Sequence, residues 1–174
     1  SQVQDWTLAT HTATDSVPGI ANAYSDRLVQ AVTRARKHAD VVVVYLHWGI
    51  EYESCPSAEQ RSLAAALAAA GAAAVVGTHA HVLQGAGWRD DGSYVAYGLG
   101  NYFWWRSFGN EQDDNGVLTL SFRHGRVVAA HFLATHLDDR GVPIVATGAQ
   151  RERILAEWAD VRECADLLAA PPGH

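Results

Sequence analysis

Two apolar segments that each end in histidine constrain the fold of this chain more than any other feature. Residues 41–46 read VVVVYL and are followed by His47, and residues 72–76 lead through two further residues to His79 and His81. Four consecutive valines without alternation are typical of a strand buried on both faces, as in the middle of a parallel sheet. We therefore expect two neighbouring central strands.

The segment between these strands has the pattern of one helix over residues 57–70. Ser57 and Gln60 fit a capping box at its start, and Gly71 is a typical stop at its end. A strand, a helix and a second strand in succession predict a right-handed βαβ unit with parallel strands. Because parallel strands end at one edge of the sheet, the three histidines are expected to meet in one crevice.

Three imidazoles at one sheet edge are typical of a metal site. His79 and His81 are two residues apart, so on extended backbone both side chains point to the same side, and Gly77 is expected to allow a turn before them. For an isolated pair, closing a strand with polar residues is an equally good explanation. His47 at the neighbouring strand end favours the metal. Glu51, four residues later, is either a hydrogen-bond acceptor that orients a ligand imidazole or a plain loop carboxylate.

The remaining elements complete an α/β fold. The pattern predicts a helix over residues 21–39, a strand over 94–97, an antiparallel hairpin from strands 117–122 and 127–133, and an amphipathic helix over 154–168. The 174 residues suffice for a single domain with a hydrophobic core.

Composition excludes some classes of function. A net charge of −6 argues against a nucleic-acid partner, and no apolar stretch is long enough for a membrane span. A serine hydrolase is disfavoured because no G-x-S-x-G motif occurs.

Cys55 and Cys164 could pair in an exported protein, but two unrelated thiols are the expectation. The chain shows no signal peptide, has no methionine and opens with Ser-Gln-Val-Gln, which indicates a piece of a longer protein.

Several spaced motifs resemble one known family. They are the segments LHWGIEY (46–52), GTHAHVLQ (77–84) and YGLGNY (97–102), together with Pro56 and Gln60. In this order they are similar to the bacterial CapA-like proteins, accessory factors of capsule and poly-γ-glutamate synthesis. The resemblance covers residues 40–105 and is expected to continue to 153. It implies part of a metallophosphoesterase-like αββα sandwich, in which the βαβ unit is followed by the hairpin and the C-terminal helix.

The resemblance also implies a site that binds two divalent ions, Mn, Fe or Zn. His47 and His79 would bind one ion and His81 the other, with the remaining ligands in the first half of the fold. That half includes an Asn-His pair, and no such dipeptide occurs here. We therefore expect the C-terminal portion of a larger CapA-like domain that holds one ion or none and is inactive alone.

Two functions follow as hypotheses. In the first, the complete protein is a metal-dependent, phosphoesterase-like hydrolase acting on an envelope polymer or another substrate with phosphate or amide groups. In the second, it is a non-catalytic scaffold for polymer assembly or export. Both place the protein in the bacterial cell envelope or on its outer face, with an N-terminal complement or a second copy completing its sheet. Trp48 and the aromatic residues 102–105 serve either as core or as a polymer platform, and Asn101 is expected to face the site.

Overall fold

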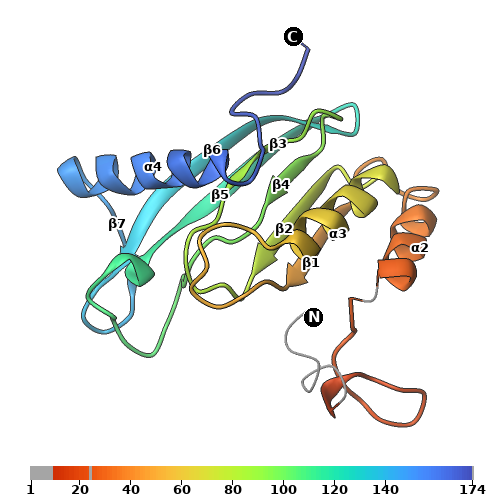
Figure 1. Ribbon diagram of the computed structural model, residues 1–174, viewed down its shortest axis with the longest axis horizontal. Coiled ribbons are helices and arrows are strands. Elements are labelled where there is room, and N and C mark those ends of the chain that lie inside the picture. Colours follow the sequence, from red (N-terminus) through yellow and green to blue (C-terminus); the bar gives the residue numbers. More distant parts are fainter. Residues whose placement is uncertain (1–9, 24, 174) are drawn as a thin grey trace.

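The computed structural model describes residues 10–23 and 25–173 and shows a mixed α/β fold (Figure 1). Its first sheet has the strand order β1-β2-β4-β3. The strands are β1 (Val43–His47), β2 (Ala74–Thr78), β3 (Ala86–Trp88) and β4 (Tyr94–Ala96). β1, β2 and β4 are parallel, and β3 is antiparallel to β4.

The predicted βαβ unit is confirmed. Helix α3 (Ala58–Ala69) connects β1 to β2, and these strands pair in parallel with His47 opposite Thr78. The capping box is present, because Ser57 Oγ accepts a hydrogen bond from the Gln60 amide at 3.2 Å and Gln60 Oε1 accepts one from the Ser57 amide at 2.9 Å. These two bonds satisfy amide groups at the helix start that have no partner within the helix.

A second, antiparallel sheet follows in the chain. It has the order β5-β6-β7, with strands β5 (Asp114–Arg123), β6 (Arg126–Leu137) and β7 (Pro143–Val145). The predicted hairpin is β5–β6, and its turn residues His124 and Gly125 both have positive φ, at 51° and 77°. Two positive φ values are typical of the tight turns whose twist matches that of paired strands. The short strands β3 and β7 were not predicted.

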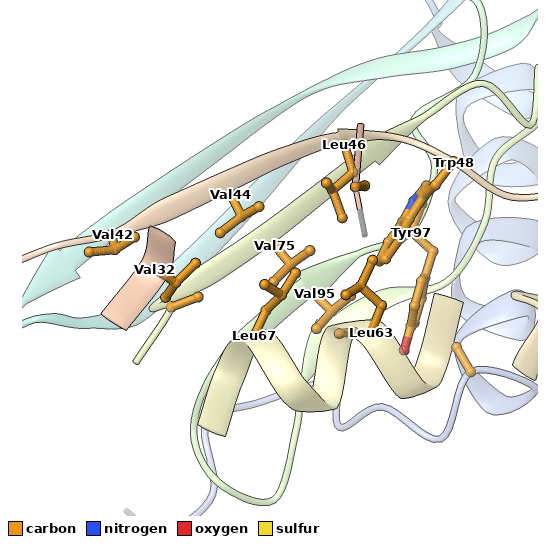
Figure 2. Close-up of a cluster of buried hydrophobic side chains, with 14 of the residues drawn as sticks. Val32, Val42, Val44, Leu46, Trp48, Leu63, Leu67, Val75, Val95 and Tyr97 are labelled. Carbon is orange, nitrogen blue, oxygen red and sulfur yellow. The ribbon is translucent and has the colours of Figure 1, made fainter. Parts of the chain in front are cut away.

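Two helices cover one face of the first sheet, and the second sheet and a third helix cover the other face. Helices α2 (Ser25–Ala35) and α3 lie on one face, where Val32, Leu63 and Leu67 pack against Val44, Leu46, Val75 and Val95 (Figure 2). On the other face, Ala74, Tyr94 and Ala96 pack against β6 and against helix α4 (Gly148–Glu163). This is the α/β sandwich that the sequence predicts. α4 begins and ends earlier than expected, and α2 is shorter.

The prediction that the valine strand is buried on both faces is wrong. β1 lies at the edge of the sheet, and its residues alternate between buried and exposed. Val43 is 50% exposed and Tyr45 is 70% exposed, while Val44 and Leu46 are buried. The reason is that the second sheet packs over β2, β3 and β4, and the core on that face contains no residue of β1.

The expectation of two unrelated thiols is also wrong. Cys55 and Cys164 form a disulfide across 109 positions of sequence, with their Cα atoms 5.7 Å apart. The bond joins the loop after β1 to the residue that ends α4. Within the described residues, no helix has the length and apolar character needed to cross a membrane.

Candidate metal centre

The ends of β1 and β2 bring the three predicted histidines together. His47 is the last residue of β1, and His79 and His81 follow β2 directly. The ring centroids of His47 and His79 are 4.5 Å apart, and those of His79 and His81 are 5.7 Å apart. The parallel pairing of the two strands is what places residues more than thirty positions apart side by side.

One set of possible metal ligands is compact enough to share an ion. Among the described residues, donor atoms of Glu51, His79 and His81 all lie within 4.8 Å of one another. Two nitrogen ligands at roughly 2.1 Å from one zinc ion lie at most about 4.2 Å apart. The set is therefore close to the spacing that one ion requires. Two imidazoles and a carboxylate also suit the borderline metals expected from the sequence.

His47 lies beside this set but is not one of its members. Glu51, considered above as an orienting acceptor, instead offers its own oxygen as a ligand atom. The ligand role of His47 thus stays a prediction, and it would need either a rotation of the ring or a second ion.

The backbone at the two histidines is not extended. His79 has φ 102° and His81 has φ 60°, so the expectation that both side chains share a side of an extended strand is wrong. Residues other than glycine rarely adopt positive φ, and such positions cluster at functional sites. Gly77 itself lies in β2 and is needed for close packing: a Cβ there would approach Trp48 Nε1 to 1.9 Å and the Tyr97 carbonyl oxygen to 2.2 Å.

Burial favours the metal-binding, neutral form of His47 and His79. Burial lowers the pKa of His79, and the neighbouring charge of His47 lowers it further. Burial is also the main cause of the lowered pKa of His47, with a smaller contribution from His81. Metal ions bind neutral imidazole, so a lowered pKa keeps these rings available at neutral pH.

The loop that carries Glu51 is fixed at several points. The Tyr52 amide donates to the Ala80 carbonyl at 2.7 Å, and Gln84 Nε2 donates to the Glu53 carbonyl at 2.7 Å. The disulfide at Cys55 ties the same loop to α4. Hydrogen bonds thus join the Glu51 loop directly to the segment that carries the two histidines.

Aromatic rings surround His81. The Trp104 ring centroid lies 4.9 Å from that of His81, and the Tyr52 ring centroid lies 6.1 Å away. Trp48, by contrast, is completely buried, stacks on Tyr97 at 5.6 Å and donates from Nε1 to the Tyr97 carbonyl at 2.9 Å (Figure 2). Trp48 is therefore a core residue. From the sequence, Trp104 was a candidate for the core or for a polymer platform, and no pattern indicated that Tyr52 would flank His81.

Asn101, which the sequence places in the glycine loop near the expected site, contacts His81. The Oδ1 atom of Asn101 lies 2.7 Å from His81 Nδ1, and the side chain is 4% exposed. It is the residue that follows Gly100 in the loop after β4.

Comparison with known proteins identifies the family. A family described as bacterial capsule synthesis protein PGA_cap matches residues 1–104, well over half of the chain. The chain belongs to the PGA_cap family. The matched range contains His47, Glu51, His79, His81 and Asn101, so the whole candidate centre lies within it.

Two curated relatives are similar over part of their length. The PGA biosynthesis protein CapA of Bacillus subtilis (strain 168) is 41% identical over 90 residues, which is 52% of this chain and 23% of that protein. The capsule biosynthesis protein CapA of Bacillus anthracis is 36% identical over 121 residues, which is 62% of this chain and 29% of that protein. The chain thus matches less than a third of either relative.

Proposed function

We propose that this chain supplies one side of a divalent-metal centre in a capsule-synthesis protein, and that the complete centre hydrolyses an envelope polymer or a related substrate with phosphate or amide groups. The observation that carries the proposal is the convergence of Glu51, His79 and His81 at the carboxyl edge of two parallel strands. Family membership and the names of the relatives support the biological setting.

The chemistry of the proposal depends on a few side chains. Glu51, His79 and His81 would hold one ion, Mn, Fe or Zn, and His47 stands next to His79 for a second. A divalent ion would supply a Lewis acid that polarises a phosphoryl or carbonyl oxygen. Glu51, His79 and His81 would fix the ion, and burial lowers the pKa of His79 and so favours its neutral imidazole. Tyr52 and Trp104 form an aromatic wall beside His81.

We also propose that the chain forms part of a larger domain. The side chains of Val43 and Tyr45 are exposed on one face of β1, and β1 has no strand on its outer side within the described structure. An exposed, apolar edge strand readily pairs with a further strand. That strand would come from an N-terminal complement of the domain or from a second copy of the chain, and it would bring further ligands to the centre.

The disulfide supports a location in the cell envelope or on its outer face. Disulfides persist in oxidising compartments and are rare in the cytosol. The pair Cys55–Cys164 is therefore the feature of this chain that best fits export.

The second candidate is a scaffold that assembles or exports polymer without catalysis. The specific observation in its favour is that the compact donor set holds three ligands, with Glu51 exposed, while two-metal hydrolases need more. Exposed aromatic side chains at Tyr102, Phe103 and Trp105 offer a surface for a polymer.

Segment replacement in a relative separates the two candidates. We expect a Bacillus subtilis CapA that carries the aligned segment of this chain to hydrolyse a simple phosphate ester or amide in the presence of Mn²⁺ or Zn²⁺. The same chimera with His79→Ala and His81→Ala should lose at least 100-fold in turnover, because two of the three ligands of the reacting ion are gone. Glu53→Gln is the matched control, since Glu53 lies in the same exposed loop outside the donor set.

Turnover and polymer production are measured together. Production of PGA by the double variant at the level of the unmodified chimera, with no turnover in either, would contradict the enzyme and support the scaffold.

A further inference from the structure

We infer that Asn101 is a positioning residue that holds the proton of the His81 imidazole on Nδ1 and so turns the lone pair of Nε2 toward the metal. The expected effect of this proton position on metal binding rests on the proposed metal centre. The position of the proton itself follows from the hydrogen bonds around Asn101.

The orientation of the Asn101 amide is determined by its nitrogen. Nδ2 donates to the backbone carbonyls of His81 and Gln112, each at 3.3 Å. Carbonyl oxygens only accept hydrogen bonds, so the atom that faces them must be the NH₂ group. The other amide atom, Oδ1, is then the one that lies 2.7 Å from His81 Nδ1.

This orientation settles which ring nitrogen carries the proton. An amide oxygen has no hydrogen to donate, so the bond between Asn101 and His81 requires a proton on Nδ1. A neutral imidazole carries one proton, which leaves Nε2 with a free lone pair. Free histidine in water prefers the opposite tautomer. Asn101 therefore selects the less common form, in which Nε2 is the ligand atom.

The fold holds Asn101 firmly enough for this role. The residue is 4% exposed, and the backbone before it is constrained at Gly100, which has φ +75° and whose Cβ position lies 2.3 Å from the Asp114 carbonyl oxygen. An antiparallel bridge between Leu83 and Leu99 joins the loop of Asn101 to the segment after His81. A side chain larger than hydrogen at Gly100 would move Asn101 away from the ring.

The side chain of Asn101 thus positions both the ring and the backbone of His81. Its oxygen orients the ring, and its nitrogen binds the carbonyl of the same residue, whose φ of 60° is unusual for a residue other than glycine. Groups that orient a ligand histidine in this way typically change metal affinity 10- to 100-fold when removed. The sequence led us to expect Asn101 near the site, but no pattern assigned its amide atoms to the ring and the backbone of His81.

The test reads the tautomer directly in metal-free protein. Long-range ¹H–¹⁵N NMR spectra above pH 8 should show His81 with its proton on Nδ1 in the wild type. Asn101→Leu removes the acceptor, so the proton should move wholly or partly to Nε2. Asn101→Asp loses the two bonds donated by Nδ2 but keeps an oxygen acceptor beside Nδ1, so the proton should stay on Nδ1. A wild-type ring with its proton on Nε2, or a signal unchanged in Asn101→Leu, would overturn the inference, and the first of these needs no variant to fold.

Zinc titration of the same proteins separates this inference from the metal proposal. We expect Asn101→Leu to bind Zn²⁺ 10- to 100-fold more weakly than the wild type, and Asn101→Asp to bind with little loss. Equal zinc affinity in the wild type and in Asn101→Leu would overturn the positioning role. A wild-type protein with the proton on Nδ1 that binds no Zn²⁺ would support the assignment of the tautomer and contradict the proposed metal centre.

Discussion

Replacement of both cysteines, in a Cys55→Ser/Cys164→Ser variant, is expected to lower the free energy of unfolding by about 3–5 kcal/mol. The two residues are separated by 109 positions, so the bond removes a large loop-closure entropy from the unfolded chain, and about 4.7 kcal/mol is the chain-entropy estimate for a loop of roughly 100 residues. The bond also holds the Glu51 loop against the end of α4. Urea unfolding followed by tryptophan fluorescence measures the change.

The control for this prediction is reduction of the wild type. Dithiothreitol should destabilise the wild-type protein by the same amount and leave the double serine variant unaffected. A wild type whose stability is the same with and without reductant would show that the disulfide contributes nothing to the fold.

Gly77→Ala is expected to cost about 3–5 kcal/mol of stability, more than ordinary overpacking, because the new methyl group meets two buried partners at once. The Cβ position lies 1.9 Å from Trp48 Nε1 and 2.2 Å from the Tyr97 carbonyl oxygen. These two atoms form a buried hydrogen bond of 2.9 Å, so the methyl group must separate them and leave both polar groups without a partner. Urea unfolding of the variant measures the loss.

A second glycine provides the matched control. Gly109 has open space around its Cβ position and a φ of +72°, so Gly109→Ala is strained only in its backbone and should cost about 1–2 kcal/mol. If the two variants were equally stable, close packing at Gly77 would not explain why a glycine stands there.

Local sequence signals predicted the part of the fold that positions the site. The capping box at Ser57 and Gln60 and the two apolar runs were sufficient for the βαβ unit, because each depends on neighbours within a few residues. Parallel pairing of the two strands was enough to predict that His47 and His79 lie side by side.

Other features depend on contacts distant in sequence and were missed for that reason. The place of β1 at the edge depends on the strand order, and the exposure of its second face depends on the reach of the second sheet; no local pattern encodes either. The disulfide joins segments that meet only after α4 packs beside β3. The positive φ of His79 and His81 was also missed, because neither residue is a glycine and only the loop conformation imposes that φ. The orientation of the Asn101 amide likewise depends on contacts within the loop.

The metal content of the purified chain tests the central claim most directly. After incubation with Zn²⁺ and gel filtration, mass spectrometry should find about one equivalent of zinc in the wild type, as for one site with three protein ligands. It should find none in His79→Ala/His81→Ala, a reduced amount in Glu51→Gln and an undiminished amount in the Glu53→Gln control. A wild type without zinc, or a double variant that retains as much as the wild type, would contradict a metal centre at the end of β1 and β2.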